Sequence, residues 1–455
     1  MLCDEPAAGG GVPRYTTPLA ECLAALGHKV LTLSSGAYLR RYYPMLRPAT
    51  KQVSRKGTLV RVIVRNPDGL AYNWGRGDLD VRQPGVDLVV RRLLNEFRPD
   101  VAHVHSMLGF SLQLLEDLAS RHVPIVVSHH EFWFVCQRRV LFTPEGGRCL
   151  GPEANGSNCA DCFGTVHVSA ERRKWALRNL VGARRWDAMA RLLPARSREP
   201  DATLSARHLP SDRARREAYA LRLAEAVRVL SDVVDVNLVV STFVGDQLSR
   251  HGVPESRIAV HHIGTRAAEQ IRRTELPSLE AGIVVGCTAG VNSPYKGAEI
   301  LVKAFRQLTG LPTKLLMYGA ATTAYAERVR SLANGAPVEF KGPYRYEELS
   351  DIMQRFHFAV VPSVCPDTAP QTVFEAFAAG RPVIGSDIGG IPDFVRDGVN
   401  GLLVPPGDID ALGVQLRRLA TDASLVRQFS AAIPEMKTIS KDAEELLDIY
   451  GSLRG

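Results

Sequence analysis

The sequence lacks most of the features that mark membrane, secreted or disulfide-stabilised proteins. No uncharged apolar run in its 455 residues reaches the length of about 18 that a membrane-spanning helix needs. The N-terminal stretch MLCDEPAAGGG is acidic and has no apolar segment of the kind found in signal peptides. Eight cysteines are too few for a disulfide scaffold in a chain of this length. A cytoplasmic location is therefore the default expectation.

Net positive charge is also lacking outside one segment. Residues 171–222 hold 14 Lys and Arg against 6 Asp and Glu, and this excess equals the net charge of +8 of the whole chain. The rest of the protein is near neutral, and no aromatic residues are interleaved with basic ones as a base-stacking surface. We therefore expect no nucleic-acid partner.

The chain does contain a repeated alternation of short apolar runs and amphipathic stretches. The runs are continuous rather than alternating, as expected for parallel strands that are buried on both faces. Strand–helix alternation predicts the α/β class, with doubly wound, Rossmann-like sheets. Strands are predicted at 28–34, 100–106, 124–130, 237–241, 257–264, 282–289, 313–320, 338–342, 358–363 and 381–387.

The alternation occurs twice, which predicts two domains that face each other across a cleft. The first covers residues 1–264 and carries a Cys-containing, Arg-rich insertion at about 132–225. A linker at 265–282 follows, then a second domain at 283–438. A final helix at 439–455 is predicted to return to the first domain.

The first strand is unusually short, because only MLCD precedes the first glycine loop. Either the strand is truncated or the true N-terminus lies upstream. The loop itself, with Gly9, Gly10 and Gly11, allows close approach of the backbone to a ligand, and the helix that follows offers N–H groups suited to phosphate. A plain turn is the alternative.

Two later loops carry charged residues where a strand meets a helix. Lys296 follows the strand at 282–289 and could neutralise a diphosphate, although a solvated surface lysine is the alternative. Asp367 and Glu375 flank the start of a helix predicted at 369–380, where carboxylates could accept hydrogen bonds from sugar and ribose hydroxyls. Compensation of the helix dipole explains Asp367 as well, but it explains Glu375 poorly.

These motifs, in this order, resemble the family-four glycosyltransferases of GT-B architecture. The resemblance rests on the N-terminal GGG, on PDVAHVH and HHEFW, and on SPYKGAEILVKAF, VPSVCPDTAPQTVFEAFAAGRPVIGSDIGGIPDFV and NGLLVPPGD. It covers nearly the whole chain apart from the insertion. It implies transfer of a hexosyl or related group from a nucleotide diphosphate sugar, of UDP or GDP type, to an acceptor hydroxyl with retention of configuration. Polysaccharide, glycolipid and natural-product glycosylation are all compatible with it.

The resemblance also implies roles for individual residues. Lys296 matches the lysine that binds the donor diphosphate, and Glu375 matches the acid that holds the nucleotide ribose. Asp367 stands where an acid contacts hydroxyls of the donor sugar. The remaining matches are His130 near the reacting face of the sugar, Gly389 and Gly390 near the sugar and phosphates, and Gly10 and Gly11 across the cleft, while His105 is a weaker match than His130. We expect His130, Lys296 and Asp367 to take part in catalysis, with no cofactor or metal at the catalytic centre.

Two departures from the family pattern bear on this expectation. Asp367 replaces the usual glutamate, and Val291 stands where the family often has an arginine five residues before the lysine. Either Lys296 and helix N-termini suffice for the diphosphate, or a basic residue of the insertion replaces the missing charge. A non-catalytic subunit that binds nucleotide sugars is therefore the alternative function.

Four cysteines in the insertion form a separate pattern. Cys136, Cys149, Cys159 and Cys162 give the spacing C-x12-C-x9-C-x2-C, which in a reducing compartment is typical of a structural zinc site. An iron–sulfur cluster, disulfides and free thiols are the alternatives.

The segment 171–193 predicts a helix with Trp175, Trp186, Met189 and Leu193 near one face. One interpretation is a helix that packs on the first domain near the acceptor side. The other is an interfacial helix that contacts anionic lipid at the inner face of the membrane and serves a lipid-linked acceptor. The acceptor, a small molecule or a lipid-linked sugar, stays open.

Overall fold

The computed structural model describes most of the chain. No helix in the described part is long and apolar enough to cross a membrane. The predicted helix at 171–193 and most of the Arg-rich insertion lie outside the described residues, so both stay predictions. The described ranges are 1–4, 10–36, 48–65, 77–143, 145–164, 212–280 and 282–454.

The N-terminal domain contains two groups of strands that the start of the chain joins into one sheet. Leu2 forms parallel bridges to Leu33 in β1 and to Val104 in β4, so residues 1–4 lie between the two groups. The groups have the orders β2-β3-β1 and β4-β5-β6-β7, with β1 (Val30–Gly36), β2 (Ala49–Lys56), β3 (Leu59–Arg65), β4 (Ala102–Val104), β5 (Ile125–His129), β6 (Val236–Val239) and β7 (Ile258–Val260).

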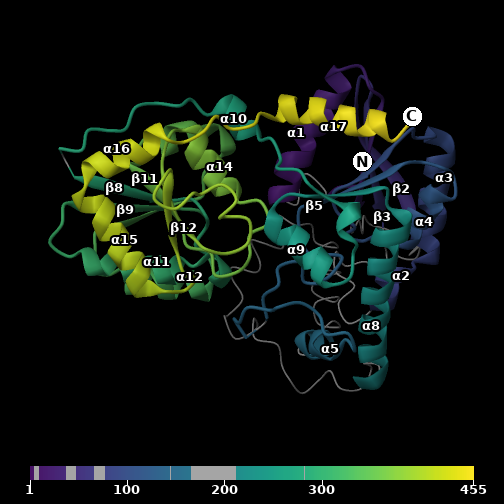
Figure 1. Ribbon diagram of the computed structural model, residues 1–455, viewed down its shortest axis with the longest axis horizontal. Coiled ribbons are helices and arrows are strands. Elements are labelled where there is room, and N and C mark those ends of the chain that lie inside the picture. The colour runs from purple at the N-terminus through teal and green to yellow at the C-terminus, as the bar shows by residue number, and fades with distance from the viewer. Residues whose placement is uncertain are drawn as a thin grey trace.

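The helices of this domain follow the strands in the alternating pattern expected of a doubly wound fold. The long α8 extends away from the sheet beside α2 and α5 (Figure 1). The helices are α1 (Gly11–Ala25), α2 (Gly77–Val81), α3 (Pro84–Phe97), α4 (Gln113–Ala119), α5 (Ser157–Gly164), α8 (Asp212–Arg228) and α9 (Thr242–Arg250).

The C-terminal domain has a fully parallel six-stranded sheet of order β10-β9-β8-β11-β12-β13. In sequence order this is 3-2-1-4-5-6, which places the topological switch point, where Rossmann-like sheets bind ligands, between β8 and β11. The strands are β8 (Ile283–Cys287), β9 (Thr313–Tyr318), β10 (Val338–Gly342), β11 (Phe358–Val361), β12 (Val383–Ser386) and β13 (Gly401–Val404).

Helices cover both faces of this sheet, and the last one leaves the domain. In Figure 1, α17 (Ile439–Ser452) runs in yellow along the top of the molecule to the N-terminal domain, where it contacts α1. The other helices are α10 (Arg266–Gln270), α11 (Ala298–Phe305), α12 (Ala324–Leu332), α13 (Leu349–Met353), α14 (Gln371–Ala378), α15 (Ile409–Thr421) and α16 (Ala423–Ala431).

Each domain has its own hydrophobic core, and α17 completes that of the N-terminal domain. Ile439, Ala443 and Leu446 of α17 are buried in that core, as is Phe374 of α14. Two further clusters lie on the two faces of the C-terminal sheet. The predicted architecture, two Rossmann-like domains across a cleft, is confirmed.

The hairpin of β2 and β3 was not predicted from the sequence. β3 pairs with β1 in parallel and with β2 in antiparallel register. β2 reads ATKQVSRK and is largely exposed at the edge of the sheet, so it lacks the continuous apolar run that identified the other strands.

Candidate functional site

A cleft of about 810 Å³ lies between the two domains at the switch point of the C-terminal sheet. Five of the residues predicted from the sequence line it: Gly10 and Gly11 on one side, His130 beside them, and Lys296 and Asp367 on the other. Three other predicted residues, Glu375, Gly389 and Gly390, lie behind this lining. The structure therefore brings the two halves of the predicted site to one place.

Lys296 and Asp367 form an ion pair at the carboxyl ends of β8 and β11. The Nζ of Lys296 lies 2.5 Å from Oδ1 of Asp367, whose Oδ2 accepts a hydrogen bond from Ser363 Oγ at 2.5 Å. Burial acts to lower the pKa of Lys296, but the charge and hydrogen bond of Asp367 raise it above its usual value. The lysine is therefore held as a cation that faces the cleft.

Gly297 explains why Lys296 reaches this position. Its φ of 72° is in the left-handed region, and a Cβ there would lie 1.8 Å from the carbonyl oxygen of Pro362. The turn after β8 thus packs directly on the segment after β11, which carries Asp367.

Glu375 is buried in α14 and pairs with a residue of the other domain. Its Oε1 lies 3.5 Å from Nη1 of Arg14, and the Glu375 side chain is only 3% exposed. Burial raises the pKa of Glu375 to about 7, although Arg14 acts in the opposite direction. Because Arg14 lines the cleft, it lies between Glu375 and the open space.

Gly389 and Gly390 support the loop that carries Asp367. The N–H of Gly390 donates to the carbonyl oxygen of Asp367 at 2.6 Å, and a Cβ on Gly389 would lie 2.4 Å from the same oxygen. A Cβ on Gly390 would also lie 2.7 Å from Cβ of Ser241 in the N-terminal domain. In this structure these glycines therefore fix the Asp367 loop and permit close contact of the domains.

His130 belongs to a buried group of aromatic residues in the N-terminal domain. Its Nε2 lies 3.0 Å from Nδ1 of His105, and its ring centroid lies 4.7 Å from that of Tyr15. Burial lowers the pKa of His130 to about 3, with smaller opposing contributions from neighbouring charges. His130 is therefore neutral at physiological pH and can act as a hydrogen-bonding group. Its carbonyl oxygen also accepts from Thr368 Oγ1 across the cleft.

Reasoning from the sequence missed a charged cluster on the N-terminal side of the cleft. Arg139 Nη1 lies 2.7 Å from Glu131 Oε2 and 3.5 Å from Asp4 Oδ2, and Ser106 Oγ donates to Asp4 at 2.6 Å. Burial raises the pKa of Glu131 to about 7; Arg139 lowers it in part and Asp4 raises it further. The signal was present, because Asp4 and Glu131 both stand where a strand of the sheet ends.

Val291, which stands where the family often has an arginine, does not face the cleft. Val291 is 1% exposed and belongs to the core of the C-terminal domain, whereas Gly290 lines the cleft. The insertion supplies Arg138 and Arg139 to the same cleft. Basic residues of the insertion therefore line the cleft, as one of the two alternatives for the missing charge requires.

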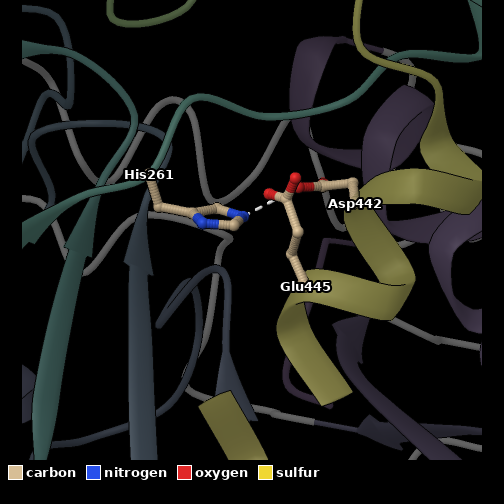
Figure 2. A group of neighbouring side chains, drawn as sticks. All are labelled: His261, Asp442 and Glu445. Atoms are coloured by element: carbon tan, nitrogen blue, oxygen red, sulfur yellow. Dashed lines mark hydrogen bonds and ion pairs between the residues drawn. The ribbon is translucent and has the colours of Figure 1, made fainter. Parts of the chain in front are cut away.

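A second group of ionisable residues anchors α17 outside the cleft. Figure 2 shows His261 pointing at Asp442, with Glu445 on the same side of α17. Lys437 Nζ lies 2.8 Å from Asp442 Oδ1 and 2.7 Å from Glu445 Oε2, so an ammonium group already compensates the two carboxylates. Burial alone would raise the pKa of Asp442, but hydrogen bonds and charge from His261, Lys437 and Tyr15 lower it to about 2. We interpret this group as a structural anchor.

The four cysteines of the insertion form no disulfide with one another. They come from three places in the chain, namely Cys136, Cys149 and the helix α5. Cys136 and Cys149 pack against the core of the N-terminal domain, and Cys159 and Cys162 lie on α5. Within the described residues, no three of their sulfurs lie within 4.8 Å of one another.

The architecture and the cleft together define a two-domain GT-B protein. Comparison with known families agrees: residues 282–422 match the model for glycosyl transferases group 1, and residues 10–154 match the model for the glycosyl transferase 4-like domain. The two matches together cover more than half of the chain. The chain belongs to the family-four glycosyltransferases.

Individual relatives are distant. The D-inositol 3-phosphate glycosyltransferase of Rhodococcus erythropolis is 27% identical over 257 residues, which cover 53% of this chain and 57% of that protein. The chain spans about half the length of several such relatives. Sucrose-phosphate synthase of Thermosynechococcus elongatus has a TM-score of 0.63 at 17% identity, with 99% and 98% of the two chains covered. HepE of Anabaena, solved with UDP and glucose, has a TM-score of 0.59 at 14% identity, with the same coverage. These structures show the shared fold.

Proposed function

We propose that this protein transfers a sugar from a nucleotide diphosphate sugar to an acceptor hydroxyl, with retention at the anomeric carbon. The observation that carries the proposal is the convergence of Lys296, Asp367 and His130 on one cleft between two Rossmann-like domains. Such a cleft can hold a nucleotide on one domain and an acceptor on the other. Closure of the cleft excludes water, which limits hydrolysis of the donor.

The donor diphosphate would bind at Lys296, beside the N-terminus of α11. Lys296 is cationic, and its present partner is the single carboxylate of Asp367. A diphosphate offers this lysine a stronger anionic partner, and it releases Asp367 to accept hydrogen bonds from hydroxyls of the donor sugar. The ion pair would thus keep both groups in place until the donor arrives.

The ribose would bind at Glu375 once Arg14 has moved aside. Glu375 is buried beneath Arg14, and a carboxylate accepts well from two adjacent hydroxyls. The arginine then remains in the cleft and can contact a phosphate. This exchange makes donor binding dependent on the contact between the domains.

In the reaction, the bond between the anomeric carbon and the diphosphate oxygen breaks, and its electron pair leaves with the diphosphate. A new bond forms to the acceptor oxygen, whose proton is taken up by the departing phosphate. Positive charge develops on the sugar ring and negative charge on the leaving group. Lys296 and the nearby backbone N–H groups would stabilise the leaving group, and neutral His130 would hydrogen-bond the sugar near the reacting carbon.

Relatives suggest which substrates to try first. HepE was solved with UDP and glucose, and the Rhodococcus relative is named for an inositol phosphate acceptor. UDP-glucose is therefore the first donor to test, and a small alcohol that carries an anionic group is a reasonable first acceptor. GDP-linked sugars follow, and a thermal-shift screen of nucleotide sugars orders the candidates.

The test compares turnover by the wild type with that of Lys296→Ala and Glu375→Ala. We expect both variants to lose donor hydrolysis and transfer, whereas Lys303→Ala, on the exposed side of α11, should retain them. Unchanged turnover in the two site variants would refute the assignment. Donor binding without any turnover in the wild type would instead favour the alternative, a non-catalytic nucleotide-sugar-binding subunit. The anomeric configuration of the product, read by NMR, tests retention.

A peripheral membrane contact through residues 171–193 is a separate part of the proposal. Its support is the basic, Trp-containing sequence of that segment. Co-sedimentation with anionic vesicles at low and high salt tests it, because binding to an anionic surface weakens as salt screens the charges. Absence of salt-sensitive binding would remove the membrane contact and favour a soluble acceptor.

A further inference from the structure

The cysteine loop, residues 136–164, is held against α8 by polar contacts rather than by a core of its own. Buried Arg222 of α8 donates to Asp80 Oδ2 at 2.6 Å, and the Nε2 of Gln137, next to Cys136, donates to the same carboxylate oxygen at 2.8 Å. Tyr219 Oη donates to Gln137 Oε1 at 2.9 Å. Where α5 meets α8, the buried apolar residues are Ala160 and Tyr219. Hydrophobic burial between α5 and α8 is therefore small compared with the cost of ordering this part of the loop, although Leu141 earlier in the loop is buried in the core of the N-terminal domain.

Of the four cysteines of this loop, Cys159 and Cys162 pack with α8, and Cys136 and Cys149 pack against the core of the N-terminal domain. Cys159 and Cys162 are three residues apart on α5 and therefore share one helical face. They pack with Tyr219 of α8. Just before α5, Gly156 lies directly against α8, because a Cβ at this position would lie 2.6 Å from the carbonyl oxygen of Arg216. Asn158, next to Cys159, donates through Nδ2 to the carbonyl oxygen of Gly151 at 2.8 Å, which ties α5 to the turn of Cys149. The hydrogen bond from Tyr219 to Gln137 ties the same region to Cys136.

Backbone geometry at Cys149 fits a thiolate ligand. The N–H of Gly151 points at Cys149 Sγ with an N···S distance of 3.4 Å, and Gly151 has a φ of 115°, which lets the turn form. An N–H group two residues after a cysteine stabilises sulfur that carries negative charge, as metal-bound sulfur does. A neutral thiol gains less from this contact, because it is a weak acceptor.

We propose that Cys136, Cys149, Cys159 and Cys162 bind one structural zinc ion. Four thiolates fill the tetrahedral coordination of zinc and leave no open position, so the ion would be structural. Sulfurs around such an ion lie about 3.8 Å apart, given Zn–S bonds of about 2.3 Å. Binding would therefore draw the thiols closer than they lie in this structure.

The zinc site would also fix two cations of the cleft. Arg138 and Arg139 follow Cys136 by two and three residues, and both line the cleft. A metal that holds Cys136 thus limits the movement of the turn that presents these arginines. This second step rests on the proposed function, whereas zinc binding itself does not.

Metal analysis of the purified full-length protein tests the proposal. We expect about one zinc per chain in the wild type and in Cys22→Ser, whose cysteine lies on α1 outside the loop, and a loss of zinc in Cys159→Ser. Iron in place of zinc, a metal-free wild type, or full zinc content in Cys159→Ser would each overturn it.

A second measurement covers the case in which Cys159→Ser fails to fold. Cobalt(II) added to the metal-depleted wild type should give the intense visible absorption of a tetrahedral thiolate site, and zinc should abolish that absorption. A weak octahedral spectrum would refute the four-thiolate site.

Neither readout depends on turnover, so a protein that holds zinc but transfers no sugar would contradict the proposed function and leave the zinc site intact. Loss of donor affinity on zinc removal would support the link to Arg138 and Arg139, and unchanged affinity of the folded metal-free protein would refute that link.

Discussion

The affinity for a nucleotide sugar should rise between pH 6 and pH 8, because Glu375 titrates in this range. Burial raises the pKa of this carboxyl to about 7 in the free protein, and ribose hydroxyls bind best to the ionised form. If only the carboxylate binds, the population of binding-competent protein is about one tenth at pH 6 and about nine tenths at pH 8. The dissociation constant should therefore fall about tenfold over this interval, which corresponds to about 1.4 kcal/mol.

The charges around Glu375 support this assignment of the pH dependence. Burial raises the pKa values of Tyr344 and Tyr346 to about 12, so both tyrosines stay neutral. His130, with a pKa of about 3, also does not change its charge. Glu131 does titrate near pH 7 at the opposite side of the cleft, so it needs its own control.

Calorimetry with UDP-glucose at several pH values is a suitable assay. A nucleotide sugar keeps a constant charge over this range, whereas UDP has a terminal phosphate that titrates near pH 6, at about the second pKa of a phosphate monoester. Glu375→Gln should bind more weakly at pH 8 and lose most of the pH dependence. Glu131→Gln and the exposed Glu347→Gln should retain it. A flat wild-type profile, or an unchanged profile in Glu375→Gln, would refute the reasoning.

The same pKa predicts that the stability of the folded protein falls over the pH range in which donor affinity rises. A folded pKa raised from 4.5 to about 7 favours the folded state fully below pH 4.5, and this contribution is lost as the pH rises through 7. At pH 8 the buried carboxylate therefore costs roughly 3 kcal/mol relative to a neutral group. Glu375→Gln should unfold at a higher temperature than the wild type at pH 8 while it binds the donor less well. A lower melting temperature would show that the ion pair with Arg14 compensates the burial of the carboxylate.

Two further predictions concern the scaffold around the site. Asp442→Asn should lower the free energy of unfolding at pH 7 by about 2 kcal/mol. The folded pKa of Asp442, depressed to about 2, gives stability that is present above pH 4 and lost as the pH falls towards 2. Denaturation compared with that of the exposed Asp448→Asn on the same helix measures this effect, and equal stability of the two variants would contradict it. Gly297→Ala should destabilise the protein far more than Gly310→Ala, because both have positive φ but only the first Cβ meets backbone, 1.8 Å from Pro362; similar melting temperatures would show that the turn after β8 can relax.

The sequence was most informative where parallel strands end. Lys296, Asp367 and His130 each follow a buried strand, and the carboxyl ends of parallel strands share one edge of a sheet. Their convergence was therefore predictable without coordinates. The same rule extends to Asp4 and Glu131, but neither stands in a motif that marks a ligand site, so the rule alone did not single them out.

The sequence could not predict contacts that depend on how the two domains meet. Arg14 and Glu375 are far apart in the chain, and their pairing follows from the placement of α1 against α14. The core position of Val291 likewise depends on the path of the turn after β8 rather than on a motif. Periodicity and turn signals report local structure, and they carry no information on such long-range geometry.

These cross-domain contacts change the interpretation of the missing family arginine. The C-terminal domain presents Lys296 to the cleft, and Arg14, Arg138 and Arg139 approach the same space from the N-terminal domain. A diphosphate that requires more than one cation is then held best when the domains are close together. On the proposed function, donor affinity and domain closure would be coupled, because Lys296 and the three arginines line the cleft from opposite domains.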